Sequence, residues 1–223
     1  MLSALLLTFA FGTAEPLAQE PSAAAEVPKG AVVLFDGKST EEWVHRRTRE
    51  AVKWKVENGE LIVSDGPDIV TKREFGDFKL HLEFWLPLMA DAKDQGRANS
   101  GVFSHGRYEI QILDSYKNPT YATGGCGALY GQKDPDADAI KPPETWNTYD
   151  IVFRAPRLDG EGKLLEKPRI SVWHNGIQIH KEVEINKPST ASQTETRWLT
   201  KGPISLQNHG NPIRFRNIWV QPM

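Results

Sequence analysis

The sequence has little of what several classes of protein depend on. Cys126 is the single cysteine among 223 residues, which excludes an intrachain disulfide and a cysteine-based zinc site. Neither sign of charge is in excess, with 27 Lys and Arg residues against 29 Asp and Glu residues. No basic surface is therefore expected, and we predict no nucleic-acid partner. No window of helical length combines an apolar stripe with capping residues, so helices are not expected to build the fold.

The chain begins with a short apolar run followed by small residues. The run from Met1 to Ala14 is too short to span a bilayer comfortably, and Ala14 or Ala18 would each suit the end of a signal peptide. The segment after it is rich in Ala, Pro and Glu, a composition typical of disorder. We therefore expect a signal peptide over residues 1–18 and a disordered leader over residues 19–30. The mature protein is predicted to be soluble and exported, periplasmic or extracellular, without membrane insertion; its oligomeric state is left open.

Alternating apolar and polar residues recur throughout the rest of the chain. Asn58-Gly59 and Asn175-Gly176 each separate two such runs, and Asn-Gly is the strongest short-range signal for a two-residue hairpin. About ten short runs with turn residues between them predict one all-β domain over residues 31–223, a sandwich or jelly roll of antiparallel sheets. Two long loops, residues 115–145 and 186–201, interrupt the pattern. We expect them to form the walls of a pocket over one sheet face.

The strand-like run from Tyr108 to Asp114 carries three acid or amide side chains. Alternation places Glu109 and Gln111 on one face and Tyr108 and Ile110 on the other. Strict alternation would place Asp114 on the apolar face, whereas a β-bulge would bring it back beside Glu109 and Gln111. Two carboxylates and an amide on one face would suit acid/base chemistry on a polar substrate. The alternative is an exposed polar face with Asp114 as a turn residue.

A second polar cluster is expected where a later strand ends. Ser205, Gln207 and His209 share a face there, next to a glycine turn, which makes His209 a candidate for proton transfer. His105 is the other histidine placed for such a role. An exposed turn histidine is the alternative interpretation of each.

Four further residues are candidates for substrate binding. Amide side chains suit sugar hydroxyls and indole rings suit sugar ring faces, although the same residues are typical of strand ends, turns and cores. Glu83 faces opposite its apolar neighbours and would serve as a wall of the same concave surface. The four candidates are Glu83, Asn99, Trp146 and Asn147.

No cofactor and no metal ion is expected. The spacing of Asp134, Asp136 and Asp138 is similar to a calcium loop, but the glycine and the bidentate glutamate of such a loop are missing.

The spacing of Glu109, Gln111 and Asp114 resembles the Glu-x-Asp-x-x-Glu signature of laminarinase-type retaining glucanases, which are concanavalin-like jelly rolls. Gln111 stands where those enzymes have Asp, and Asp114 is one methylene shorter than their second Glu. An amide can orient a hydroxyl but cannot transfer a proton. The departures therefore argue against ordinary retaining hydrolysis, which needs two carboxylates about 5 Å apart.

Nearly the whole chain, residues 31–220, resembles the 3-keto-disaccharide hydrolases, also described as 3-keto-glucoside 1,2-lyase/3-keto-2-hydroxy-glucal hydratase domains. Each matching segment is weak alone, but their order is specific. The resemblance implies a concanavalin A-like jelly roll, an exported location and activity on sugars oxidised at C3. The segments are residues 33–38, 54–61, 75–84, 99–103, 108–114, 127–131, 146–149, 206–210 and 215–218.

A ketone at C3 acidifies the proton on C2, so a base can remove it and expel the glycosidic oxygen from C1. We therefore predict an enzyme that cleaves 3-keto-glycosides by β-elimination, hydrates the resulting 3-keto-glucal, or does both, with carbohydrate as its substrate. Glu109 or Asp114 is the predicted base and His209 the acid or enolate donor, while Gln111 and Gln207 position hydroxyls. The alternatives are a laminarinase-like retaining glycosidase and a non-catalytic carbohydrate-binding module, since jelly rolls host all three.

Overall fold

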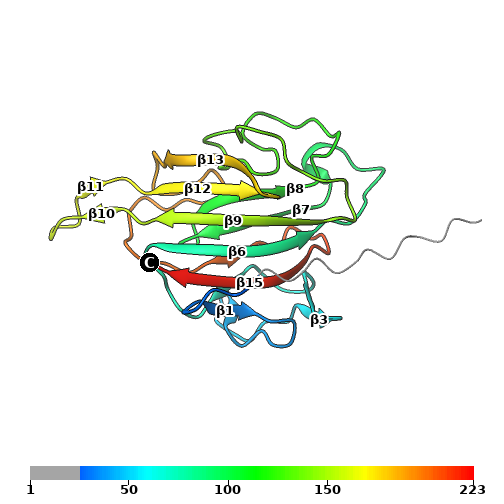
Figure 1. Cartoon of the computed structure of the whole chain (residues 1–223), viewed down its shortest axis with the longest axis horizontal. Helices are drawn as coiled ribbons and strands as arrows, with labels where there is room; N and C mark the ends of the chain where they lie inside the picture. The colour runs from blue at the N-terminus through cyan, green and yellow to red at the C-terminus, as the bar shows by residue number, and fades with distance from the viewer. Residues whose placement is uncertain (1–25) are drawn as a thin grey trace, which may run out of the picture.

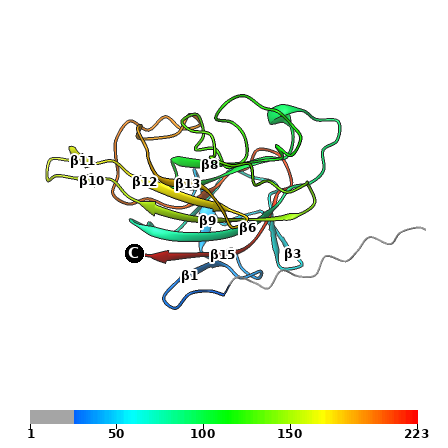
Figure 2. The ribbon, with the colours of Figure 1, turned by 45° about the horizontal axis from the view of Figure 1, so that its top comes forward.

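The structure is a computed structural model, and it describes residues 26–223. The predicted signal peptide and most of the predicted leader lie outside the described residues. Two antiparallel sheets pack face to face, as the ribbon shows in two orientations (Figures 1 and 2). The predicted fold class, an all-β sandwich, is therefore confirmed. Within residues 26–223, no helix is long and apolar enough to cross a membrane.

The larger sheet has eight strands. In spatial order it contains β13 (Ile177–Glu184), β12 (Arg169–His174), β9 (Trp146–Arg154), β6 (Phe78–Trp85), β15 (Arg214–Pro222), β4 (Glu60–Ile62) and β3 (Lys55–Glu57), with β1 (Val32–Phe35) pairing with β15.

The smaller sheet has five strands. Their spatial order is β2 (Trp43–His45), β5 (Ile69–Thr71), β14 (Ser205–Leu206), β7 (Asn99–Ser104) and β8 (Tyr108–Leu113). A separate hairpin of β10 (Arg157–Leu158) and β11 (Leu164–Glu166) projects as an arm from one end of the molecule (Figure 1). A 3-10 turn covers Asp94–Gly96.

The core lies between the two sheets because each strand turns its apolar side chains inward. Tyr108 and Ile110 of β8 are fully buried there, and the Tyr108 ring stacks on Phe153 of β9 with centroids 5.5 Å apart. Across the same interface, the Tyr149 hydroxyl donates a hydrogen bond of 2.7 Å to the Gln111 carbonyl. The polar side chains of β8 therefore face away from the large sheet.

Both predicted Asn-Gly hairpins form. Asn58 and Gly59 connect β3 with β4, and Asn175 and Gly176 connect β12 with β13. All four have positive φ, between 52° and 79°, which is the conformation that a two-residue turn of this type requires. These turns fix which residues of each strand pair face the core.

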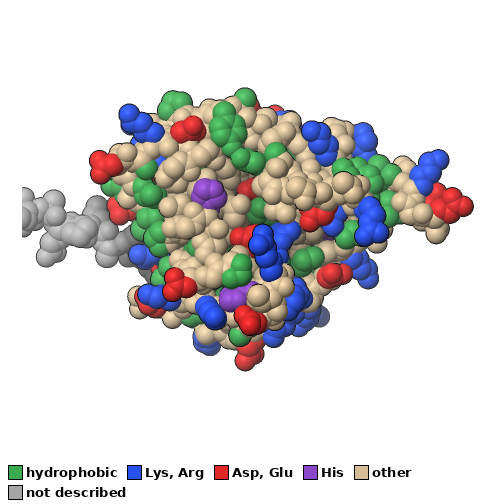
Figure 3. Space-filling view, turned by 180° about the vertical axis from the view of Figure 1, so that it is seen from behind, with side chains coloured by type: hydrophobic (Ala, Val, Ile, Leu, Met, Phe, Trp, Pro, Cys, Tyr) green, Lys and Arg blue, Asp and Glu red, His purple; other side chains and the backbone are tan. Residues whose placement is uncertain are grey.

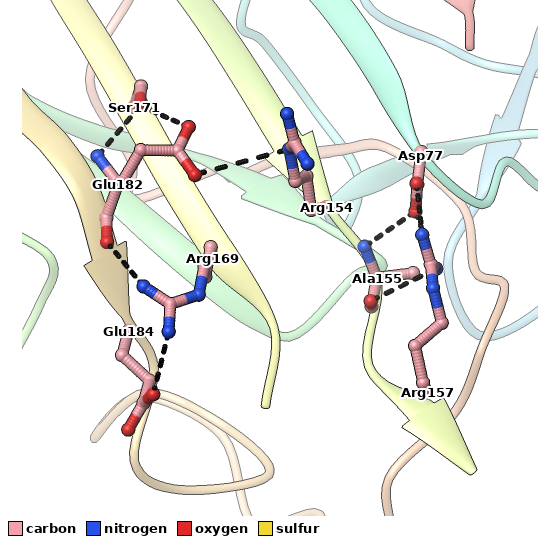
Figure 4. Close-up of polar contacts among 8 residues, drawn as sticks. All are labelled: Asp77, Arg154, Ala155, Arg157, Arg169, Ser171, Glu182 and Glu184. Carbon is pink, nitrogen blue, oxygen red and sulfur yellow. Dashed lines mark hydrogen bonds and ion pairs between the residues drawn. The ribbon is translucent and has the colours of Figure 1, made fainter. Parts of the chain in front are cut away.

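Ion pairs connect the outer strands of the large sheet and the base of the arm (Figure 4). Arg157 Nη2 lies 2.5 Å from Asp77 Oδ2, and Asp77 Oδ1 accepts a 2.8 Å hydrogen bond from the Ala155 N–H. The hydrogen bond from Arg157 lowers the pKa of Asp77. Arg169 pairs with Glu184 at 3.2 Å on the neighbouring strands. Because most of these side chains are largely exposed, their contribution to stability is modest.

Candidate active site

A pocket of about 260 Å³ lies on the face of the small sheet that points away from the core. Figure 2 shows long loops over this side of the molecule, and Figure 3 shows that polar uncharged side chains and backbone make up much of its surface. Both loops predicted to form the walls do so. The pocket is lined by Gln95, Asn99, Glu109, Gln111, Tyr130, Ala191, Ser192, Gln207 and His209.

Neighbouring strands supply the floor of this pocket in one continuous row. Gln207 follows β14, and its N–H donates a 3.0 Å hydrogen bond to the Gly101 carbonyl of β7. Gly101 is in turn paired with Gln111 of β8. Cross-strand partners share a face, so Gln207, Gly101 and Gln111 lie side by side. The structure thus brings together five predicted site residues: Asn99, Glu109, Gln111, Gln207 and, at the exposed rim, His209.

Glu109 is the one carboxylate among the described residues that line the pocket. It is buried, with 2% of its surface exposed, and this burial raises its pKa from 4.5 to about 7. The Ser192 hydroxyl donates to Oε2 of Glu109 and opposes that shift. A carboxyl group with a pKa near neutrality can both take up and release a proton at physiological pH, as a general base must.

The carboxylate of Glu109 lies over Gly101, where only a glycine leaves room for it. A Cβ at position 101 would sit 3.0 Å from Cδ and 3.1 Å from Cγ of Glu109, and closer still to Oε1. Gly101 has no positive φ, so space rather than backbone conformation requires the glycine here. The sheet and Ser192 therefore hold the carboxylate from two sides.

The loop that carries Ser192 is anchored to β8. The Thr190 hydroxyl accepts a 3.2 Å hydrogen bond from the Glu109 N–H and donates a 2.9 Å hydrogen bond to the Arg107 carbonyl. These bonds dock the polar loop of residues 186–201 against the strand that supplies the carboxylate. Ser192 was not a predicted site residue, because nothing in the loop sequence indicates what it packs against.

Gln95 orients the amides of the pocket. Its Oε1 accepts hydrogen bonds from Asn99 Nδ2 at 3.2 Å and from Gln111 Nε2 at 3.1 Å. Its Nε2 donates to the Thr120 hydroxyl at 2.8 Å and to the Gly124 carbonyl at 2.9 Å, which joins the sheet to the long loop of residues 115–145. Gln95 was also missed, since it lies in the 3-10 turn outside any strand pattern.

Tyr130 is a third pocket residue that was not a predicted site residue, although it lies in the segment 127–131 that carries the family resemblance. Leu129 forms an isolated antiparallel bridge with Ile110, and the Tyr130 N–H donates a 3.1 Å hydrogen bond to the Glu109 carbonyl. The Tyr130 hydroxyl is hydrogen-bonded to the hydroxyl of Tyr121.

The prediction that a bulge brings Asp114 beside Glu109 is wrong. β7 and β8 pair without a register shift from Asn99 with Leu113 to Ser104 with Tyr108, and β8 ends before Asp114. The side chain of Asp114 is fully buried away from the pocket, with Oδ2 3.2 Å from Arg97 Nη1. Burial raises the pKa of Asp114, and the Arg97 guanidinium counteracts this rise. Asp114 therefore forms a buried ion pair with Arg97 instead of lining the pocket.

Glu83 and Trp146 lie on the other sheet, so the prediction that they line this pocket is wrong. Glu83 accepts hydrogen bonds of 2.6 Å from Arg216 Nε and from Asn217 Nδ2. The guanidinium of Arg216 lies 3.9 Å above the Trp146 ring. Both residues belong to strands of the eight-stranded sheet and form a local cluster with β15.

His105 and Asn147 are also absent from the residues that line the pocket. His105 lies in the turn between β7 and β8, where Nε2 hydrogen-bonds to the Gly76 carbonyl at 3.1 Å and burial lowers the pKa of the ring. Asn147 is buried on β9, where its Oδ1 accepts from the Lys141 N–H at 3.1 Å and from Asn175 Nδ2 at 2.8 Å. Both predictions of substrate contact are therefore wrong at this pocket.

A second cavity, of about 430 Å³, adjoins the first. The two share Ala191, and the larger one begins at Gly131 and Gln132 and extends along residues 187–191 and 193–196. Its lining contains one carboxylate, Glu195, and no histidine among the described residues. It offers space and polar contacts rather than a second set of acid/base groups.

No cluster of three or more His, Cys, Asp or Glu side chains suited to a metal ion occurs within residues 26–223. In the segment similar to a calcium loop, Asp136 instead lies 2.5 Å from Lys133 Nζ, and Asp134 accepts a 2.6 Å hydrogen bond from the Thr123 N–H.

Comparison with known proteins gives consistent matches over nearly the whole chain. The sequence model of a family described as "3-keto-alpha-glucoside-1,2-lyase-like domain" matches residues 30–221. A curated relative, a 3-keto-disaccharide hydrolase from Bacteroides thetaiotaomicron, is 24% identical over 226 aligned residues, which cover 86% of this chain and 78% of the relative.

Solved structures from Parabacteroides distasonis share the fold. One candidate glycosyl hydrolase is 38% identical, with a TM-score of 0.82 over 88% of this chain and 85% of that chain. A second, 25% identical, has a TM-score of 0.60 over 86% of this chain and 99% of the other.

Proposed function

Because this chain belongs to the 3-keto-alpha-glucoside-1,2-lyase-like family, we propose that it cleaves glycosides whose sugar carries a ketone at C3. In this proposal the enzyme removes the proton on C2, expels the glycosidic oxygen from C1 and then hydrates the 3-keto-glucal. The observation that carries the proposal is a buried carboxylate, Glu109, with a pKa of about 7. Among the described residues it is the one carboxylate of the pocket, whose other polar lining consists of amides, hydroxyls and one histidine.

Glu109 is the base in this proposal. The C3 ketone makes the C2 proton acidic enough for a carboxylate, and the resulting enolate places negative charge on the C3 oxygen. Gln207 and His209, at the end of β14, supply N–H donors toward that oxygen. Gln111 Oε1 has no hydrogen-bond partner among the described residues, so it is available to a substrate hydroxyl. The volume of about 260 Å³ suits one sugar unit, being below the ~300–1,000 Å³ typical of larger ligands.

The two alternatives fit the pocket less well. Retaining hydrolysis needs a second carboxylate about 5 Å from the first, and Asp114 is instead paired with Arg97. Binding a sugar does not require a carboxylate whose pKa is raised by burial, whereas carboxylates with strongly shifted pKa values are typical of catalytic sites.

The paired comparison of a 3-keto-glucoside with the same glucoside unoxidised tests the function. We expect the purified protein to consume the 3-keto-glucoside, with release of the aglycone and transient ultraviolet absorbance from the enone, and to leave the unoxidised glucoside intact. Cleavage of both substrates would identify an ordinary glycosidase. Saturable binding of the 3-keto sugar without product would identify a binding module, and either result would overturn the proposal.

Activity should depend on pH through Glu109. Its pKa is about 7 and the base acts only when ionised, so kcat/KM should fall about tenfold for each pH unit below 7 and level off above it. The Ser192 hydrogen bond lowers this pKa, so Ser192→Ala should move the midpoint of the profile to higher pH. Ser189→Ala is the control, because the Ser189 hydroxyl donates only to the Gln193 and Glu195 carbonyls. An unmoved midpoint in Ser192→Ala would show that another group controls the profile.

A further inference from the structure

The proposed elimination leaves an alkoxide on the departing sugar unless an acid protonates its oxygen. We propose that Tyr130 is this acid, that it donates its phenolic proton to the glycosidic oxygen leaving C1, and that Tyr121 stabilises the phenolate. The inference rests on the proposed function and assigns one further catalytic residue to it. His209 then serves only as a hydrogen-bond donor to the C3 oxygen.

The register of the sheet places Tyr130 beside the base. Ile110 and Leu129 are bridge partners, and both are buried in the core between the sheets. Glu109 precedes Ile110 and Tyr130 follows Leu129, and side chains alternate between the two faces. Glu109 and Tyr130 are therefore cross-strand neighbours on the pocket face. Both residues line the pocket.

The order of the segments across the pocket matches the order of the reacting atoms. Tyr130 lies on one side of Glu109, about 4.8 Å away in strand spacing, while Gln207 and His209 follow a strand two places away on the other side, about 10 Å distant. C2, from which Glu109 takes the proton, lies between C1 and C3 in the sugar ring. With C3 toward the donors of β14, the oxygen on C1 is directed toward Tyr130.

The larger cavity provides space for a leaving sugar on the same side. It begins at Gly131, the residue after Tyr130, and shares Ala191 with the pocket. A ring that departs past Tyr130 would therefore enter this cavity of about 430 Å³.

The Tyr121 hydroxyl is placed to support the loss of the Tyr130 proton. The two hydroxyls are hydrogen-bonded, so Tyr121 can donate its proton toward the Tyr130 oxygen as the phenolate forms. The Tyr121 ring lies against Gly124, where a Cβ would overlap the ring, with Cδ2 at 2.8 Å. Gly124 also accepts a hydrogen bond from Gln95, which connects this contact to the amides of the pocket.

The proton balance closes over both half-reactions. In elimination, Glu109 takes the C2 proton, the C2–H electrons form the C1=C2 bond through the enolate, the C1–O bond breaks, and the departing oxygen takes the Tyr130 proton. In hydration, the Tyr130 phenolate takes a proton from water as its oxygen bonds to C1, and protonated Glu109 returns a proton to C2. After hydration Glu109 is again a carboxylate and Tyr130 again a phenol, because each residue has exchanged its acid and base roles between the two half-reactions.

The dependence on the leaving group tests this assignment. A 4-nitrophenolate leaves without protonation, whereas the alkoxide of a methyl glycoside does not. We expect Tyr130→Phe to lower kcat about 100-fold on methyl 3-keto-glucoside and to change it less than about threefold on 4-nitrophenyl 3-keto-glucoside. Tyr121→Phe should give the same pattern with a smaller loss, and Tyr116→Phe, outside the pocket, should change neither rate.

Activity on the nitrophenyl substrate shows at once that each variant is folded. Equal losses on both substrates, or no loss on either, would overturn the role of Tyr130 while the proposed function stands. A wild-type protein that turns over neither 3-keto substrate would instead contradict the proposed function, and this proposal with it.

Discussion

Replacing Glu109 by glutamine should lower kcat on a 3-keto-glucoside by about 10³-fold, because the amide cannot take the C2 proton. Glutamine has nearly the shape of glutamate, so it can remain over Gly101 and within reach of Ser192. Binding of the 3-keto sugar should therefore persist. Single-turnover kinetics with isothermal titration of the same variant would separate the chemical step from binding.

The same variant should be at least as stable as the wild type above pH 7. Burial raises the pKa of Glu109 from 4.5 to about 7, so the folded state holds the proton more tightly than the unfolded chain does. Its contribution to stability therefore falls as the pH rises from 4.5 to about 7 and is lowest above that range. A neutral amide removes this cost. Scanning calorimetry should show a Tm equal to or above that of the wild type at alkaline pH, and no gain below pH 4.5.

Glu83→Gln is the matched control for this experiment. Glu83 is as buried as Glu109 but lies on the large sheet and is paired with Arg216 and Asn217. Breaking a buried ion pair destabilises the fold without touching the pocket, so Tm should fall while kcat remains unchanged. A Glu109→Gln enzyme that retains kcat within tenfold of wild type would show that another group is the base.

Introducing a methyl group at position 101 should lower kcat about 100-fold with little change in Tm. The new Cβ of Gly101→Ala would overlap the Glu109 carboxylate, which must turn away from the place it shares with Ser192. Displacing a catalytic group by about 1 Å can cost 10²-fold in rate. The backbone itself tolerates alanine, since Gly101 has no positive φ.

Gly160→Ala is the control for the added methyl group, because it lies outside the pocket and a Cβ there meets nothing within 4 Å. Both variants would be assayed for kcat on the 3-keto-glucoside and for thermal unfolding. A Gly101→Ala enzyme with a lowered Tm and normal kcat would mean that the sheet, and not the carboxylate, absorbs the clash.

The strand pattern was sufficient to place Glu109 and Gln111 on one face and Gln207 at the end of a second strand. Alternation depends only on the local geometry of an extended chain, so it can be read from neighbouring residues. The same rule placed Glu83 on a polar face but could not say which sheet contains that strand. Alternation also could not decide which way the Asp114 side chain points. Its direction depends on whether the strand continues in register or ends, and the strand ends after Leu113.

What the sequence by itself determined is the all-β fold, the two Asn-Gly hairpins and the polar face that carries Glu109. Only the tertiary structure decided which groups surround that carboxylate. Ser192, Gln95 and Tyr130 come from loops without any periodic pattern, and docking against β7 and β8 brings them to Glu109. Docking of this kind depends on contacts between segments that are distant in the sequence, so no local sequence pattern predicts it. The same packing removes water from the carboxylate and raises its pKa to about 7.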